Sequence, residues 1–177
     1  MRIAQAFLAG VMAFSAGAAL ADPSPAHVGA ASSAASVTKK AQPTHGTKAQ
    51  AVAMVRRVEE SFKKNGALAT FKAISDPSSK AFHEGDLYPF VFTFKGICVA
   101  HGALPALVGK NLDGLKDPDG RYVIKDSARV ALKGGGWYDY KWPDPKTHTI
   151  VNKSSYIQKL GTHYFVGVGI YRLPHAS

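Results

Sequence analysis

The stretch from 134 to 156 constrains the fold of this chain most, because it combines a glycine run, alternating aromatic residues and a proline-bounded turn. Its sequence is GGGWYDYKWPDPKTHTIVNKSSY. Tyr138, Tyr140 and Trp142 stand at every second position, which is the period of a pleated strand. The two prolines of the Pro-Asp-Pro turn end this strand, since proline cannot donate to a ladder. We therefore predict a hairpin whose second strand runs over about 151–160.

This hairpin also predicts a ligand site, because its aromatic wall faces a strand that carries Lys153. Apolar surface with a few convergent polar groups is the usual composition of a pocket, and a lysine there favours a small organic anion. Tyr156 lies three residues beyond Lys153. Strict alternation places these two on opposite faces, so they converge only if the strand starts after Lys153 or contains a bulge. In the alternative interpretation, the aromatic residues simply cover the sheet.

The remaining pattern predicts an α+β domain with one mainly antiparallel sheet. Apolar residues from Ala51 to Phe62 recur at three and four positions, which indicates one face of a helix that ends at Asn65-Gly66. Short connections between the later strands favour antiparallel neighbours. In the last strand, Gly167 and Gly169 share a face and leave space for another group. The predicted helices are 47–66, 67–74 and 121–133, and the predicted strands are 87–94, 97–101, 137–142, 151–160 and 163–171.

The N-terminal region predicts export. Met1–Ala21 has one arginine, a small apolar run and an Ala-Leu-Ala cleavage pattern, which together indicate a signal peptide, with an uncleaved anchor as the alternative. Residues 22–46 are rich in Ala, Ser and Pro and lack an apolar period, so we expect a disordered linker. His27 and His45 within it are too isolated to indicate a metal site. The folded domain is expected over 47–173.

Charge and cysteine content exclude some classes. The net charge of +10 is spread along the chain without a run of five or six like charges, which favours a solvated basic surface over a nucleic-acid-binding one. Cys98 is the only cysteine, so no intramolecular disulfide forms, and its apolar neighbours predict a buried, inert thiol.

Motifs for catalysis and metal binding are missing from the sequence. His83, Glu84 and Asp86 lack the second histidine or thiol of a zinc site, and the aspartates between 113 and 119 lack the closing glutamate of a calcium loop. No phosphate loop, dinucleotide fingerprint, nucleophile elbow or HExxH is present. His101 has no placed partner that would make it a catalytic base. We therefore expect neither an enzyme nor a bound cofactor or metal.

Four blocks of the sequence together resemble the Cache family in its small, one-module form. They are LYPFVFTFKGICVAHG, LVGKNLDGLKDPDGRYVIKD, GGGWYDYKWPDP and KSSYIQKLGTHYFVGVGIY. The resemblance covers roughly 47–171. It implies a long N-terminal helix packed on a PAS-like sheet of five or six antiparallel strands, and an extracytoplasmic pocket for a short carboxylate or amino acid.

The resemblance also implies a set of pocket residues, with Lys153 as the partner of a ligand carboxylate. In the alternative interpretation, the aromatic residues belong to the core, His101 is an ordinary histidine and Lys153 is a solvated charge. The candidate ligand-binding residues are Tyr88, Phe92, His101, Tyr140, Trp142, Lys153 and Tyr156.

Most members of the family that this sequence resembles are sensor domains of chemoreceptors or histidine kinases, flanked by membrane spans. This sequence ends at Ser177 without a second apolar span. We therefore expect a free-standing periplasmic protein that binds a small organic anion, as a monomer or as a homodimer formed through its first helix. The alternative is an accessory subunit that docks on a membrane-bound kinase or chemoreceptor through its basic surface.

Overall fold

The computed structural model describes residues 45–172. The predicted signal peptide, Met1–Ala21, and the linker up to residue 44 lie outside the described residues. Among residues 45–172, no helix combines the length and the apolar character needed to cross a membrane.

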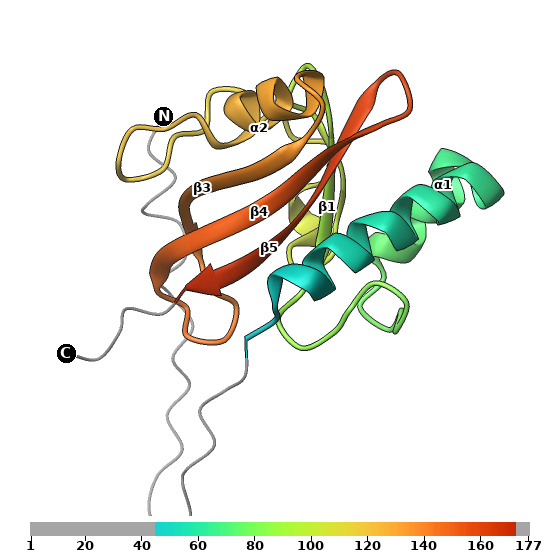
Figure 1. The fold of residues 1–177 in the computed structure, drawn as a ribbon, viewed down its shortest axis with the longest axis horizontal. Helices are drawn as coiled ribbons and strands as arrows, with labels where there is room; N and C mark the ends of the chain where they lie inside the picture. Colours follow the sequence, from blue (N-terminus) through green and yellow to red (C-terminus); the bar gives the residue numbers. More distant parts are fainter. Residues whose placement is uncertain (1–44, 173–177) are drawn as a thin grey trace, which may run out of the picture. The chain divides into compact units, whose positions relative to one another are not determined.

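The described residues form one five-stranded sheet with a helix on each face (Figure 1). The strand order is β2-β1-β5-β4-β3, and every neighbouring pair is antiparallel. This arrangement confirms the predicted α+β class with a long helix packed on a five-stranded antiparallel sheet. The elements are α1 (Lys48–Ser75), β1 (Pro89–Thr93), β2 (Cys98–His101), η1 (Pro105–Leu107), α2 (Val123–Leu132), β3 (Gly136–Pro143), β4 (Ile150–Leu160) and β5 (Tyr164–Arg172).

Helix α1 begins with a capping box and bends at a glycine. The hydroxyl of Thr47 accepts the backbone N–H of Gln50 at 3.3 Å, while the Thr47 N–H donates to the Gln50 side chain at 2.8 Å. These two bonds satisfy backbone donors that the first helical turn leaves free. Gly66 has φ 77°, outside the helical region. The predicted break therefore occurs at Gly66, although the two helical parts follow each other directly.

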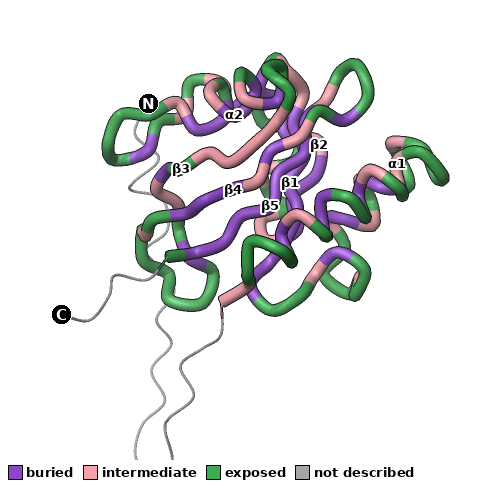
Figure 2. The backbone as a smooth tube through the Cα atoms, in the orientation of Figure 1, coloured by how far each residue is buried: buried purple, intermediate pink, exposed green. Residues whose placement is uncertain are grey.

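Each face of the sheet has its own core, and the central strands are buried along most of their length (Figure 2). Helix α1 covers one face and α2 the other, because alternating strand residues point to opposite sides. The α1 face buries Ala51, Met54, Val55, Val58, Ile74, Val91, Ala100, Val166 and Val168. The α2 face buries Phe90, Phe92, Cys98, Val123, Ile124, Ala128, Tyr140, Ile157 and Phe165.

The two glycines of β5 leave room for side chains from the neighbouring strands, as the sequence predicts. A Cβ atom at position 167 would overlap the ring of Phe90. One at position 169 would overlap the side chains of Lys153 and Ser155. Both glycines face α2, so the aromatic residues of β1 and the lysine of β4 approach each other across β5.

The folded part starts earlier than the sequence predicts. His45 Nδ1 lies 2.5 Å from Asp86 Oδ2, and the N–H of Gly46 donates to Asp86 Oδ1 at 2.8 Å. A Cβ atom on Gly46 would meet the side chain of Leu87, which shows how closely the backbone packs there. The last two residues of the predicted linker, 22–46, therefore belong to the domain, because they are fixed by the segment that precedes β1.

Candidate functional site

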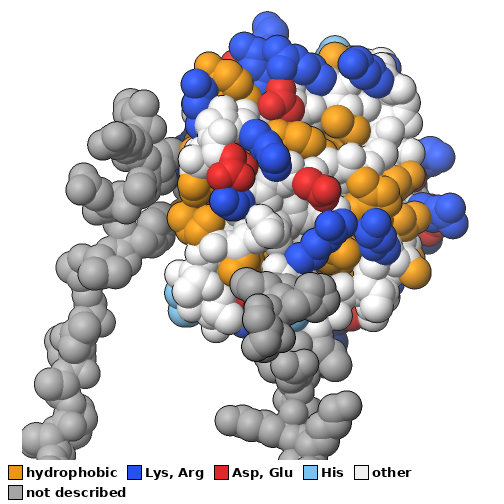
Figure 3. All heavy atoms as spheres, turned by 60° about the vertical axis from the view of Figure 1, so that its left-hand side comes forward, with side chains coloured by type: hydrophobic (Ala, Val, Ile, Leu, Met, Phe, Trp, Pro, Cys, Tyr) orange, Lys and Arg blue, Asp and Glu red, His pale blue; other side chains and the backbone are white. Residues whose placement is uncertain are grey.

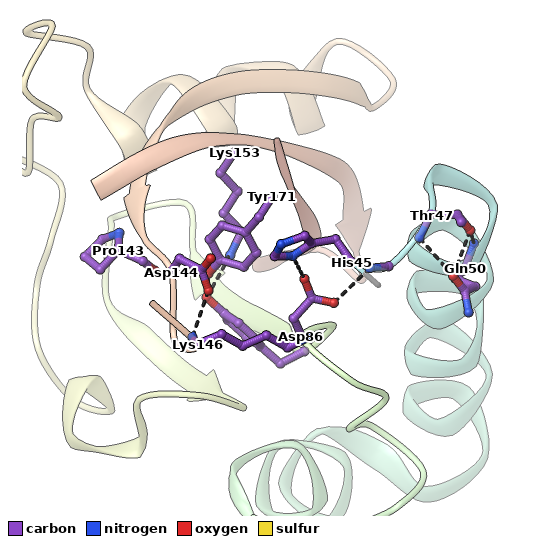
Figure 4. A network of polar contacts seen from close by, with 11 residues as sticks. His45, Thr47, Gln50, Asp86, Pro143, Asp144, Lys146, Lys153 and Tyr171 are labelled. Atoms are coloured by element: carbon purple, nitrogen blue, oxygen red, sulfur yellow. Dashed lines mark hydrogen bonds and ion pairs between the residues drawn. The ribbon is translucent and has the colours of Figure 1, made fainter. Parts of the chain in front are cut away.

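Lys153 is a buried lysine on the α2 face of β4. It is 2% exposed, and its chain crosses β5 above Gly169. The Lys153 ammonium donates to the hydroxyl of Tyr88 at 2.7 Å and to that of Tyr171 at 3.1 Å (Figure 4). Among the described residues, these two phenols are its hydrogen-bond partners. The site thus holds a cation whose direct partners carry no negative charge.

The two phenols continue the hydrogen bonding to the end of β3. The hydroxyl oxygens of Tyr88 and Tyr171 are 2.6 Å apart. Tyr171 donates to the carbonyl of Pro143 at 3.1 Å, so Tyr88 supplies the proton for the bond between the phenols. The Lys153 ammonium is therefore connected through both tyrosines to the turn between β3 and β4.

Burial makes the side chain of Lys153 easier to deprotonate. Loss of hydration lowers the pKa of Lys153 to about 7, against the opposing effect of the negative charges of Asp86 and Asp144. The ammonium also lies 4.2 Å from the ring centre of Tyr88 and 4.6 Å from that of Tyr171, where aromatic faces favour a cation. A negative group placed directly on the ammonium would restore its charge.

His101 is an uncharged residue that lines the same site. It is 2% exposed, and its Nδ1 accepts the N–H of Leu104 at 3.0 Å, which leaves the proton on Nε2. Burial lowers the pKa of His101 to about 3, and the nearby charge of Lys153 adds to this effect. Its ring packs on Tyr88 with centres 5.3 Å apart. His101 therefore offers one N–H donor and no charge at neutral pH.

A small cavity between the sheet and α2 is lined in part by Lys153. Its volume is about 10 Å³, close to the space that one water molecule needs. The predicted residues Phe92, His101, Tyr140, Trp142 and Lys153 come together around it. The complete lining is Phe90, Phe92, His101, Val123, Ile124, Tyr140, Trp142 and Lys153.

The register of the hairpin explains why the aromatic residues meet the lysine. Tyr140 of β3 is paired with Lys153 of β4, so both side chains point to the α2 face. The hydroxyl of Tyr140 lies 2.9 Å from that of Ser155, and its ring meets Trp142 edge-on with centres 6.1 Å apart. Tyr88 is also among the predicted site residues. It directly precedes β1, and its hydroxyl accepts a hydrogen bond from the Lys153 ammonium.

Tyr156 does not join these residues. It lies on the α1 face of β4, where its ring packs against Trp137 with centres 5.5 Å apart. β4 pairs with β5 in unbroken register from Asn152 to Leu160, without the bulge that would turn Lys153 and Tyr156 to one side. The prediction that Tyr156 lines the pocket is thus corrected by the alternation of a regular strand.

Three residues of the site escaped the sequence-based prediction. Alternation along β5 places Tyr171 on the same face as Gly167 and Gly169, which was a usable signal. Asp86 and Asp144 gave none, because an aspartate in a loop is normally solvated. Here they are 3% and 0% exposed, and both act on the charge of Lys153.

The candidate metal ligands have structural roles instead. Both ring nitrogens of His83 lie against backbone carbonyls, at 2.8 Å from Ser79 and 3.0 Å from Gly102. Asp117 accepts backbone N–H groups of its own loop and of Lys141 in β3. Within residues 45–172, no three His, Cys, Asp or Glu side chains gather closely enough to hold a metal ion.

Lys153 is the lysine in the cavity lining, and the other Lys and Arg residues of the described chain lie outside that lining. Figure 3 shows Lys and Arg side chains in several separate groups on one face of the molecule, mixed with acidic and apolar residues.

Cys98 is 1% exposed, and burial raises the pKa of its thiol to about 12. The predictions of a dispersed basic surface and of a buried thiol agree with these positions.

The fold and the site define the class of this protein: an α+β domain with a helix along one face of an antiparallel sheet and, under the other face, a small cavity lined mainly by aromatic and aliphatic side chains with one lysine and one histidine. The family model described as "Cache domain" matches residues 44–173. The chain belongs to the Cache domain family. Cache domains are periplasmic or extracellular sensor domains of signalling proteins, which confirms the predicted sensory, small-molecule-binding class.

Two characterised proteins align with parts of the chain. The sensor histidine kinase MctS of Rhizobium johnstonii is 38% identical over 87 residues, which are 49% of this chain and 19% of the kinase. The methyl-accepting chemotaxis protein McpP of Pseudomonas putida is 33% identical over 75 residues, which are 41% of this chain and 14% of the receptor. The alignments thus span less than a fifth of either relative.

Solved structures give the same fold. A methyl-accepting chemotaxis protein from Vibrio parahaemolyticus superposes with a TM-score of 0.62 at 26% identity, over 70% of this chain and 87% of that one. A Cache chemosensory domain described for its carboxylic acid recognition superposes with a TM-score of 0.54 at 23% identity, over 70% of this chain and 86% of that one. At this identity the second likeness concerns the fold alone.

Proposed function

We propose that this Cache domain binds a small organic anion, a short carboxylate or amino acid, at Lys153, and that binding provides the input to a signalling protein without any chemical step. One observation carries the proposal: Lys153 is a fully buried lysine, yet its direct partners among the described residues are two neutral phenols. A buried charge without an opposite partner is unfavourable, and a ligand carboxylate would provide that partner.

The surroundings of the ammonium suit such a ligand. Aromatic rings from β1 and β3 offer apolar contact, and His101 offers an N–H donor without a competing charge. The neutral imidazole also has no carboxylate partner at its ring nitrogens among the described residues, which favours binding over acid–base catalysis.

Binding requires the site to open. A short carboxylate is larger than a cavity of about 10 Å³, so lining side chains must move when it enters. Trp142 is half-buried at the edge of the lining, whereas Tyr140 beside it is 3% exposed and bonded to Ser155. Trp142 is therefore the side chain we expect to move.

Periplasmic location, export through Met1–Ala21, and action as a free-standing protein belong to the same proposal. The support is the family, whose members are periplasmic or extracellular sensors, and the likeness to parts of a sensor kinase and a chemoreceptor. A membrane-bound kinase or chemoreceptor would then read the bound state.

Calorimetric titration with short carboxylates and small amino acids tests the proposal. Replacing Lys153 by Met keeps much of the side-chain volume and removes the charge. We expect binding to weaken by about 2 to 5 kcal/mol, the usual effect of removing one partner from a buried charge pair. Lys159→Met is the matched control, because Lys159 is an exposed lysine of the same strand. Equal affinity in the Lys153→Met protein would remove Lys153 from the site.

A second candidate function is supported by a groove between α1 and Trp137 of β3, with a volume of about 550 Å³. Lys48, Arg56 and Arg57 line it, and the Lys48 ammonium lies 5.0 Å from the ring centre of Trp137. Two copies of this face would bring like charges together, so its charge favours an acidic segment of a membrane-bound sensor.

Light scattering and crosslinking from position 52, which also lines the groove, test this second function. A crosslink to a membrane sensor that disappears in Arg56→Glu would support it. A crosslinked dimer of this chain would assign the groove to the predicted helix-mediated homodimer instead.

A further inference from the structure

Asp144 carries a buried oxygen atom whose hydrogen-bonding capacity is unused. The residue is 0% exposed and directly follows β3. Its Oδ1 accepts the N–H of Lys146 at 2.8 Å. Its Oδ2 is buried and has no hydrogen-bond partner within residues 45–172. A buried carboxylate oxygen without a donor is unfavourable, so this atom indicates a missing partner.

The unused oxygen belongs to the region around Lys153. Figure 4 shows the Asp144 carboxyl group directed toward Lys153 and Tyr171. Its negative charge helps to keep Lys153 protonated, and it contributes to the raised pKa values of Tyr88 and Tyr171, for which burial is the larger cause. The Asp144 carboxyl group and the Lys153 ammonium are therefore close enough to interact electrostatically, although no direct contact joins them.

The backbone of the turn fixes Asp144 independently of any ligand. The N–H of Asp144 donates to the carbonyl of Thr149 at 2.9 Å, and its carbonyl accepts the N–H of His148 at 2.8 Å. The bond from Tyr171 to Pro143 holds the preceding residue. An acceptor held this way is pre-organised, so a ligand donor would gain its hydrogen bond with little ordering cost.

The balance of charges distinguishes the two buried aspartates. Asp86 already accepts from Gly46 and is paired with His45, whereas Asp144 has a free oxygen. A plain carboxylate would neutralise Lys153, but it would add negative charge near Asp144 and leave Oδ2 without a donor. A ligand that carries a donor group near its carboxylate would satisfy both groups.

We propose that Asp144 is a specificity-determining residue that selects ligands bearing an ammonium or hydroxyl group near the carboxylate. The inference rests on the proposed function of the Lys153 site, which it narrows to amino acids and hydroxy acids. Lys153 binds the carboxylate and Asp144 Oδ2 accepts a hydrogen bond from the second group.

Three ligands with one carbon skeleton test the inference: propionate, lactate and alanine carry a hydrogen, a hydroxyl and an ammonium group at the same carbon. We expect calorimetry on the full chain to show lactate or alanine binding at least about tenfold more tightly than propionate, the equivalent of one good hydrogen bond.

Asp144→Asn is the matched variant. An amide keeps the shape of the side chain and the acceptor for Lys146, but it replaces the free oxygen by a donor. We expect the preference for lactate or alanine over propionate to fall to within about threefold. Asp119→Asn removes the same charge from an exposed position and should keep the preference.

Each outcome gives a decision. Propionate binding as tightly as both other ligands would overturn the role of Asp144 while leaving the Lys153 site intact. A preference that survives in Asp144→Asn would also overturn it. If that variant does not fold, the ranking of the three ligands by the natural protein still decides. If none of the three binds, the proposed function fails and this inference with it.

Discussion

Gly169 lies beneath the side chain of Lys153, and its missing Cβ gives the lysine its path across β5. A Cβ atom at position 169 would overlap the Lys153 chain and the Ser155 hydroxyl. A glycine on one strand and a long flexible cation on the next thus place an ammonium inside the domain. The position of the charge depends on this pair.

Gly169→Ala is therefore expected to displace Lys153 from its route. Extra volume in a packed core typically costs about 1–3 kcal/mol of unfolding free energy. The displaced ammonium should also bind a carboxylate at least about tenfold more weakly. Gly114→Ala is the control, since a Cβ there meets nothing within 4 Å. Thermal unfolding and calorimetry measure both effects, and an unchanged ligand affinity would show that the route across β5 is not needed.

Ligand binding should weaken as the pH rises through about 7. A carboxylate pairs with the charged form of Lys153, and burial lowers the pKa of Lys153 to about 7 in the free protein. Above that pH a proton must be taken up on binding, so the dissociation constant should rise by up to about tenfold per pH unit.

The two tyrosines and His101 beside Lys153 do not change their charge between pH 6 and 9. Burial raises the pKa of Tyr88 and Tyr171, and it lowers the pKa of His101 to about 3. Calorimetry at pH 6, 7, 8 and 9 measures the effect. A ligand affinity that does not change across that range would contradict a role for the Lys153 charge. The charged and titratable groups around Lys153 are Tyr88, Asp86, His101, Asp144 and Tyr171.

Trp142 should report ligand entry. It lines a cavity that is too small for a carboxylate, and it is the half-buried aromatic residue of that lining. In a Trp137→Phe protein, Trp142 is the remaining tryptophan. Its emission should change with saturating ligand at the calorimetric midpoint. The complementary Trp142→Phe protein should show no such change, and a response from Trp137 alone would place the movement on the other face.

Removing the charge of Asp86 should loosen the start of α1 and shift the pH profile. Asp86→Asn loses the carboxylate oxygen that is hydrogen-bonded to His45, and we expect a loss of about 1–3 kcal/mol in stability with faster amide exchange over 46–51. Less negative charge near Lys153 lowers its pKa further, so the fall in ligand affinity should begin at a lower pH. Glu60→Gln, at an exposed position of α1, should change neither.

The sequence revealed the fold because its periodic signals are local. The two-residue period of β3, the glycine pair of β5 and the break at Gly66 each follow from neighbouring residues, and the structure has all three. The alternation along β4 separated Lys153 from Tyr156 correctly, while the family resemblance placed them together.

The rest of the site depends on contacts that no local pattern encodes. Asp86 and Asp144 stand in loops, and their burial depends on how the residues before α1 and the β3–β4 turn pack in the folded domain. The size of the cavity likewise depends on side chains from β1, β3 and α2. Such long-range packing decides whether a predicted pocket is open or nearly filled.

The most direct test of the central claim is a crystal structure of the protein with the tightest-binding ligand of the calorimetric panel. We predict the ligand carboxylate within about 3 Å of the Lys153 ammonium, in charge-assisted hydrogen-bond contact, with Trp142 displaced to make room. A ligand bound elsewhere, with Lys153 still held only by Tyr88 and Tyr171, would contradict the account.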